Sequence, residues 1–265
     1  MLKIEHISKT FNPRTVNEKK ALSDLSLSLE DGEFVTVIGS NGAGKSTLLN
    51  AIAGTWPLDE GKIIIDGTDI TSLPDYKRAK FIGRVFQDPL MGTAADMWIE
   101  ENMALALRRG QKRTLAQGIT SAQREQFRVL LKDLDLQLEE RLSTKAGLLS
   151  GGQRQALTLL MASMNHPQLL LLDEHTAALD PRTAKKVLTI TDKLVRENNL
   201  TTLMITHNMQ DAIDYGDRLI MMNDGMIILD IKGEEKKNTT REELISRFND
   251  LSEEKLNSDN LLLTS

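Results

Sequence analysis

The sequence predicts an α/β fold with a mostly parallel β-sheet and a helical insertion near its middle. A glycine-rich run at 39–47 lies between a strand candidate and a helix start. Short apolar runs recur at 169–172, 203–205 and 219–221, which is typical of buried parallel strands. From about 88 to 149 the apolar residues follow helical spacing instead. Strands that alternate with helices favour a parallel sheet, and the helical stretch indicates an insertion.

Four strand candidates precede the helical region. Residues 2–7 alternate between polar and apolar side chains, and residues 34–38 form an apolar run that leads into the glycine-rich segment. Residues 62–67 predict a short strand that ends in a turn, and residues 82–86 predict another strand. We expect a helix at 46–53, directly after the glycine-rich run.

The last part of the chain predicts a polar tail with one short helix. Thr240 and Glu243 have the spacing of a capping box, which predicts a helix that ends near Phe248. We therefore divide the chain into a domain at 1–230 and a C-terminal tail at 231–265.

Composition limits the class of protein. A chain of 265 residues suits one large domain, and 40% apolar with 27% charged residues is typical of a globular protein. The sequence contains no run of eighteen apolar residues, so it predicts no membrane span. Without cysteine there is no disulfide framework and no thiolate chemistry, which fits a reducing compartment. A net charge of −5 argues against a general nucleic-acid binder.

One basic cluster lies in the helical region, at Arg108, Arg109, Lys112 and Arg113. Its two interpretations are a nucleic-acid patch and a solvated basic face. Because no aromatic residues are interleaved with these cations, base stacking is not supported, and we favour the solvated face.

The run at 39–47 fits the pattern G-x-x-x-x-G-K-[ST], a loop that holds nucleotide phosphates. Its glycines let successive backbone N–H groups point inward at an anion, and the following helix adds its partial positive charge. We expect Lys45 to reach the β- and γ-phosphates of a nucleoside triphosphate and the Ser46 hydroxyl to bind Mg²⁺. The expected phosphate-binding residues are Ser40, Asn41, Gly42, Ala43, Gly44, Lys45, Ser46 and Thr47.

Two carboxylates follow the apolar run at 169–172. Asp173 is placed to hold Mg²⁺, and Glu174 is placed to polarise an attacking water. The alternative is a strand that runs into an acidic turn. The phosphate-binding run upstream makes that alternative the weaker one.

Three further positions carry polar chemistry. Ser150 is expected to cap a helix that begins at Gly151, and Gly152 allows close backbone approach, so this helix start suits a second phosphate. Local physics alone favours a simple capped helix. Gln87 and His207 each follow a strand, at the sheet edge where α/β folds place ligands. Structural polar groups are the alternative for both.

In this order, the motifs resemble those of the nucleotide-binding subunit of an ATP-binding cassette (ABC) transporter, over roughly residues 1–230. The matches are the Walker A motif at 39–47, the Q-loop glutamine Gln87, the signature LSGGQ at 149–153, the Walker B motif and catalytic glutamate at 169–174, the D-loop at 177–180 and the switch histidine His207. The resemblance implies a P-loop NTPase core, an N-terminal antiparallel β region and a helical subdomain inserted at about 88–165.

The resemblance also implies a homodimer that encloses two ATP molecules. Each ATP would lie on Lys45, Ser46 and Thr47 of one copy. The signature of the other copy would close over its γ-phosphate, through Ser150, Gly151, Gly152 and Gln153.

Single residues take their roles from the same resemblance. Glu174 is expected to be the general base, and His207 to contact the γ-phosphate. Asp173 and Gln87 would help to place Mg²⁺ and water. Phe11 is the candidate for stacking on adenine, with a place in the core as its alternative.

The sequence departs from the family pattern at three places. His175 follows the catalytic glutamate where proline is usual, and Ala177 stands where the D-loop commonly has serine. The helix after the signature, at 154–161, has an apolar residue in place of its usual second arginine. We expect His175 either to perturb the expected general base, Glu174, or to be a turn residue.

The expected function is ATP hydrolysis that drives a membrane permease, with import of a small solute such as an amino acid. The subunit would be cytoplasmic and peripheral on the inner face of the cell membrane, and an extracytoplasmic solute-binding protein would act with it. In this family the segment at 88–93 contacts the permease, here through Leu90 and Met91.

The alternative is a soluble ABC ATPase acting on nucleic acid or the ribosome. One cassette and no long heptad run argue against it.

Overall fold

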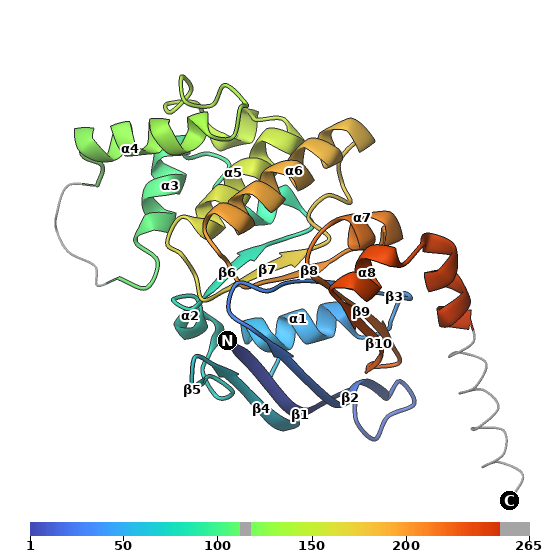
Figure 1. Ribbon diagram of the computed structural model, residues 1–265. Helices are drawn as coiled ribbons and strands as arrows, with labels where there is room; N and C mark the ends of the chain where they lie inside the picture. The colour runs from blue at the N-terminus through green and yellow to red at the C-terminus, as the bar shows by residue number, and fades with distance from the viewer. Residues whose placement is uncertain (112–117, 250–265) are drawn as a thin grey trace, which may run out of the picture.

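The computed structural model of the chain describes residues 1–111 and 118–249. Two β-sheets form its framework (Figure 1). The four-stranded sheet has the order β2-β1-β4-β5 and is antiparallel. The six-stranded sheet has the order β10-β9-β3-β8-β7-β6, in which only β10 is antiparallel. The α/β fold with a mostly parallel sheet is therefore confirmed.

The strands are β1 (Leu2–Phe11), β2 (Lys19–Leu29), β3 (Phe34–Gly39), β4 (Glu60–Ile65), β5 (Thr68–Asp69), β6 (Ile82–Val85), β7 (Leu169–Asp173), β8 (Thr202–Ile205), β9 (Arg218–Asn223) and β10 (Met226–Lys232). The helices are α1 (Lys45–Ala53), α2 (Asp75–Arg78), α3 (Ile99–Leu107), α4 (Ser121–Lys132), α5 (Gly151–Ser163), α6 (Pro181–Glu197), α7 (Met209–Asp214) and α8 (Glu234–Asn238). Two short 3₁₀ helices are η1 (Pro89–Gly92) and η2 (Ala146–Leu148).

Helix α1 lies between the two sheets, and α3 to α6 lie on the far side of the parallel sheet (Figure 1). One apolar cluster joins α1 to both sheets, through residues such as Leu49, Ile63 and Leu171. A second cluster joins α3, α4, α5 and α6 to the other face of the parallel sheet. Apolar burial on both faces accounts for the continuous apolar runs in the parallel strands.

The N-terminal region contains more strand than the sequence analysis predicted. Strand β1 continues past residue 7 to Phe11 because β2 pairs with it along its length. The signal for β2 is the alternation of Leu25, Leu27 and Leu29, which are all buried on one face. Strand β10 and helix α6 were also not predicted.

The C-terminal segment packs onto the domain. Residues 241–249 are helical, and the Thr240 Oγ1 accepts a hydrogen bond from the Glu243 N–H at 3.2 Å. Leu244 is fully buried in a cluster with Ile231 and Leu219. The helix therefore has an apolar face that the polar composition of the tail concealed. Residues 250–265 lie outside the described part.

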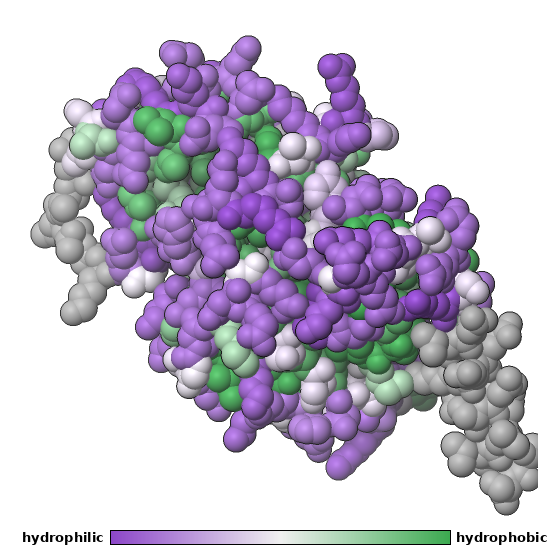
Figure 2. Space-filling model, viewed as in Figure 1, coloured by the Kyte–Doolittle hydropathy of each residue, from purple (hydrophilic) through white to green (hydrophobic). Residues whose placement is uncertain are grey.

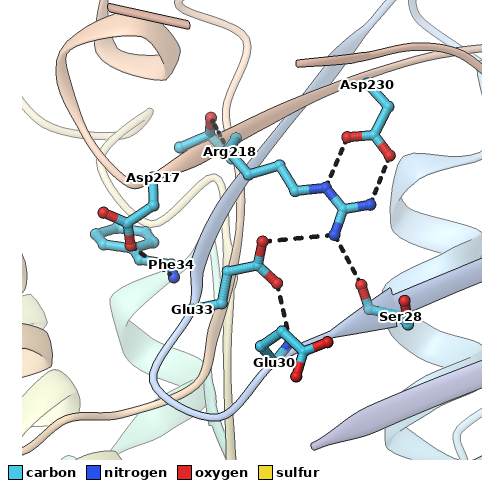
Figure 3. A network of polar contacts seen from close by, with 8 residues as sticks. Ser28, Glu30, Glu33, Phe34, Asp217, Arg218 and Asp230 are labelled. Carbon is cyan, nitrogen blue, oxygen red and sulfur yellow. Dashed lines mark hydrogen bonds and ion pairs between the residues drawn. The ribbon is translucent and has the colours of Figure 1, made fainter. Parts of the chain in front are cut away.

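Arg218 joins the two sheets (Figure 3). From β9 its Nε donates to Asp230 of β10 at 2.6 Å, and its Nη1 donates to the Ser28 carbonyl of β2 at 2.8 Å. Glu33 accepts from the same Nη1 at 3.5 Å. These partners raise the pKa of Arg218, with the Asp230 hydrogen bond as the main cause. The guanidinium thus contacts groups of β2, of β10 and of Glu33, the residue before β3.

Arg78 closes the C-terminal end of α1. It is 3% exposed, and it donates to four backbone carbonyls at 2.7–2.8 Å, those of Ala51, Ile52, Thr71 and Leu73. The last carbonyls of a helix lack partners within it, and a cation at that end is favoured by the helix dipole. Burial lowers the pKa of Arg78. One buried side chain therefore holds α1 against the turn that follows β5.

The visible surface is mostly polar, with apolar side chains gathered over α3 and α4 (Figure 2). Leu105 of α3 and Val129 of α4 are among the exposed apolar residues. Within the described part of the chain, none of the helices combines the length and the apolar character needed to cross a membrane.

We expect the Arg78→Met substitution to lower the free energy of unfolding by about 3 kcal/mol, because buried carbonyls lose charge-assisted hydrogen bonds. Urea denaturation measures this change. Lys77→Met, at the exposed neighbouring position, is the control and should change stability by less than about 0.5 kcal/mol. Equal stability of the two variants would contradict the capping role of Arg78.

Candidate functional site

The phosphate loop connects β3 to α1, and its backbone requires glycine at two positions. Gly42 has φ 83° and Gly44 has φ 98°, which L side chains rarely adopt. A Cβ at Gly44 would lie 2.5 Å from the Ala21 carbonyl oxygen of β2. The loop therefore packs backbone against backbone, with its own N–H groups left at the start of α1.

Lys45 folds back over the loop. Its Nζ donates to the carbonyls of Gly39 at 2.8 Å and Ser40 at 3.1 Å. Burial lowers the pKa of Lys45, and the charges of Glu174 and Asp173 oppose this shift. The ammonium group is thus held at the loop, close to the two carboxylates.

A cavity of about 300 Å³, here called the phosphate cavity, opens over this loop. It is lined by Phe11, Lys19, Ala21, Asn41, Gly42, Ala43, Gly44, Lys45, Ser46, Thr47 and Glu174. Residues from β1, β2, the loop and the end of β7 thus meet in one place. A polyanion beside the loop would find backbone N–H groups, two lysines and a hydroxyl there.

Glu174 and His207 approach each other from neighbouring parallel strands. The Glu174 Oε2 lies 3.8 Å from the His207 Nδ1, and His207 is largely exposed. The Glu174 N–H donates to the Ile205 carbonyl at 3.0 Å. Glu174 has φ 43°, a strained conformation for a residue other than glycine. This strained turn points an acceptor carboxylate into the phosphate cavity.

Asp173 has an arginine partner that the sequence analysis did not identify. Its Oδ2 accepts from the Arg84 Nη2 at 3.3 Å, and both side chains are 16% exposed. Burial raises the pKa of Asp173, while Arg84 opposes that rise. Arg84 also donates to Asn50 of α1 at 2.9 Å. Its position on β6, the strand paired with β7, was the available signal.

The donor set beside the loop fits Mg²⁺ held mainly through phosphate oxygens. Mg²⁺ takes one or two carboxylates together with hydroxyl, water and phosphate oxygens. Asp173 and Ser46 supply such oxygens at the ends of β7 and of the loop. Over the described residues, no group of three or more His, Cys, Asp or Glu side chains forms a metal cage.

The signature residues lie apart from the phosphate cavity. Ser150 caps α5: its Oγ accepts from the Gln153 N–H at 3.3 Å, and the Gln153 Oε1 accepts from the Ser150 N–H at 3.2 Å. Ser150, Gly152 and Gln153 line a second cavity with α6, which shares no residue with the phosphate cavity. A Cβ at Gly152 would lie 2.1 Å from the Thr183 Cγ2, so a larger residue there would require Thr183 to move.

Gln87 and Phe11 occupy different settings. Gln87 is exposed after β6, does not line the phosphate cavity, and its assignment stays a prediction. Phe11 lines that cavity and packs edge-on against Trp56, with 5.0 Å between ring centroids. The long segment that follows Phe11 closes as a β1–β2 loop and leaves the ring at the cavity. Adenine stacking also stays a prediction.

His175 points away from the site. It is 2% exposed, and its Nε2 lies 3.0 Å from the Thr191 Oγ1 of α6. The Thr191 hydroxyl already donates to the Val187 carbonyl at 2.9 Å, so it accepts from the Nε2–H of a neutral imidazole. Burial lowers the pKa of His175 to about 4. Its role is therefore packing between β7 and α6.

The basic cluster is not a single solvated face. The Arg109 Nη2 donates to the carbonyls of Met161 at 3.3 Å and Ala162 at 3.1 Å, and burial lowers its pKa. Arg109 thus supports the end of α5. Arg108 is exposed at the end of α3. Lys112 and Arg113 lie outside the described residues.

Comparisons with known proteins agree on one family. A family model described as ABC transporter matches residues 22–177. A tyrosine transport ATP-binding protein of Clostridioides difficile is 49% identical over 249 residues, which are 94% of this chain and 98% of that protein. A spermidine/putrescine import ATP-binding protein of Haemophilus ducreyi is 33% identical over 94% of this chain, and the match spans 62% of that longer protein.

Solved structures give the same result. A dimeric ATP-binding cassette, MJ0796, in a post-hydrolysis state with ADP and Pi, matches with a TM-score of 0.74 and 30% identity. The match covers 88% of this chain and 98% of that one. A nucleotide-free cassette from an ABC transporter matches with a TM-score of 0.73 and 29% identity, over 89% of this chain and 92% of that one.

We expect His175 to make folding pH-dependent. The unfolded chain takes up a proton on this imidazole below its ordinary pKa of 6.5, whereas the folded protein resists protonation until about pH 4. Stability is therefore lost as the pH falls through this window. Between pH 7 and pH 5 this contribution is about 2 kcal/mol.

The measurement is urea denaturation of the wild type and the His175→Asn variant at both pH values. The wild type should lose about 2 kcal/mol more than the variant. His166→Asn, at an exposed position, is the control and should behave like the wild type. If the stability of His175→Asn has the same pH dependence as that of the wild type, the assignment of a buried neutral imidazole to His175 is wrong.

Proposed function

Because the chain belongs to the ABC transporter family, we propose that it is the ATP-hydrolysing subunit of an importer and drives a membrane permease. The observation that carries the proposal is the phosphate cavity, where Lys45, the loop N–H groups and Glu174 converge. A phosphate-binding loop alone binds a nucleotide. A carboxylate beside it adds the base that hydrolysis requires.

The separation of the two helix starts supports an ATP-dependent homodimer. Lys45 begins α1 in the phosphate cavity, while Ser150 and Gly151 begin α5 beside a different cavity. Both starts present backbone N–H groups that suit an anion. A second copy placed head to tail would bring its α5 start to the ATP of the first, so that each site is complete only in the dimer.

Each residue of the site has a chemical task in this proposal. Glu174 accepts a hydrogen bond from the attacking water and takes its proton as the water oxygen bonds to the γ-phosphorus, while the bond from that phosphorus to the β–γ bridging oxygen breaks and ADP leaves. Lys45 and the loop hold the β- and γ-phosphates in line with that water. His207, which follows β8, donates to the γ-phosphate. Asp173 and Ser46 would hold Mg²⁺, which would neutralise charge on the phosphate oxygens.

The cargo class rests on relatives. The Clostridioides difficile relative is named for tyrosine transport, and the longer relative for spermidine/putrescine import. We therefore propose import of an amino acid or similar small solute, delivered by an extracytoplasmic solute-binding protein. The subunit would lie on the cytoplasmic face of the membrane, attached through the permease.

A groove beside η1 is our candidate for the permease contact. This cavity of about 340 Å³ is lined by Arg84, Met91, Gly92, Thr93, Ala94, Asn102, Leu105, Ala106, Arg109, Thr158, Met161 and Ala162. Met91 and Leu105 are exposed apolar residues, at 67% and 56%. Within the described residues, the Arg84 Nε and the Thr93 Oγ1 are buried without hydrogen-bond partners. An inserted segment would cover the apolar side chains and supply those partners.

A nucleic-acid ATPase is the weaker alternative. Arg109 is engaged with the end of α5, so it is not available to bind phosphates of RNA or DNA. A net charge of −5 also opposes binding to a polyanion.

We expect the Glu174→Gln variant to bind ATP with unchanged affinity and to hydrolyse it about 100-fold more slowly, because the amide is no base. ATP should then hold the variant as a dimer, which gel filtration with light scattering measures. Glu197→Gln, at the exposed end of α6, is the control and should hydrolyse normally. A variant that stays monomeric in ATP, or that keeps its turnover, contradicts the assigned role.

We expect Met91→Asp to reduce co-purification with the permease at least about tenfold, because a charge in an apolar contact costs more than 1.4 kcal/mol. ATP binding by the isolated subunit should not change. Val129→Asp, on the exposed face of α4, is the matched control. Normal permease binding by Met91→Asp would exclude the groove as the contact.

A further inference from the structure

The β1–β2 hairpin places a lysine directly opposite Phe11. Phe11 and Lys19 are Cα partners in the antiparallel pair, so their side chains project from the same face. Both line the phosphate cavity. The hairpin therefore delivers an aromatic ring and an ammonium group to the same site.

The Lys19 ammonium lies over the phosphate loop. Its Nζ is 2.9 Å from the point where a Cβ on Gly42 would stand. Because Gly42 has no side chain, the cation approaches the loop backbone closely. Such a position is beside the loop N–H groups, which are suited to bind phosphate oxygens.

The two lysines of the cavity differ in their partners. Lys45 donates to two loop carbonyls. Lys19 has neither a hydrogen bond nor an ion pair with any residue in the described ranges 1–111 and 118–249. An unpaired cation beside an anion-binding loop gains most from a charge-assisted hydrogen bond to a phosphate oxygen.

We propose that Lys19 is a second phosphate-binding lysine, which contacts the nucleotide phosphates from the hairpin side of the cavity. The inference rests on the proposed function, because it takes ATP as the ligand. The phosphate-loop motif does not include this position. The contact would let one hairpin hold both the phosphates, through Lys19, and the adenine ring, through Phe11.

The proposal predicts the dependence of binding on ligand and salt. Lys19 should strengthen binding of ATP and ADP more than binding of adenosine, which has no phosphate. The contribution should shrink as salt rises, because Lys19 is exposed and its charge is screened.

The test measures the Kd of ATP, ADP and adenosine by calorimetry for the wild type and for Lys19→Met, which keeps the length of the side chain and removes its charge. We expect Lys19→Met to weaken ATP binding about three- to tenfold at low salt and to leave adenosine binding unchanged. Lys19→Arg should bind ATP within about twofold of the wild type, since it keeps the charge.

Lys20→Met is the matched control. Lys20 is the next residue on β2, is exposed, and does not line the phosphate cavity. The Lys20→Met substitution removes the same charge from the neighbouring position. We expect ATP binding by this variant to be unchanged, and the melting temperatures of both variants without nucleotide should match the wild type.

Three outcomes overturn the proposal: unchanged ATP affinity in Lys19→Met, equal weakening in Lys20→Met, or equal weakening of adenosine binding. Lys45→Ala separates these from failure of the proposed function. If the wild type binds ATP no better than Lys45→Ala, the nucleotide site itself is wrong. If the wild type binds ATP better than Lys45→Ala, and Lys19→Met binds ATP as well as the wild type, only the role of Lys19 is wrong.

Discussion

The nucleotide site depends on close backbone packing around the phosphate loop. The Gly225 N–H, in the turn between β9 and β10, donates to the Ala43 carbonyl at 3.0 Å, and the Ser23 N–H donates to the Gly225 carbonyl at 3.0 Å. A Cβ on Gly225 would lie 2.7 Å from the Ala21 carbonyl oxygen. The loop is thus fixed between both sheets before any ligand binds, which reduces the entropy lost on binding.

Arg84 connects two parts of the molecule. Arg84 lines the groove beside η1 and also contacts Asp173, so one side chain borders both the proposed permease contact and the proposed metal ligand. Its remaining nitrogen, Nε, is buried without a partner in the described part of the chain. A segment that enters the groove would meet a group already connected to the nucleotide site, which is a direct physical route for coupling the two.

Much of the fold and site was predictable because local patterns carry it. Continuous apolar runs predicted β3, β7, β8 and β9, and the spacing around Lys45 predicted the phosphate loop. The places of Lys19, Arg84 and His175 were not predictable in this way. Each depends on a partner far along the chain, namely Gly42, Asp173 and Thr191. Their residue types alone are compatible with an exposed surface.

The sequence by itself determined the family and the phosphate-loop motif, because short motifs fix backbone conformation and side-chain type together. The tertiary structure alone decided which of these groups share a cavity. It separated Ser150 from Lys45 and buried His175. It also placed Lys19 over the loop through its pairing with β1. The physical reason is that sheet register and burial arise from contacts between distant segments, which no local pattern encodes.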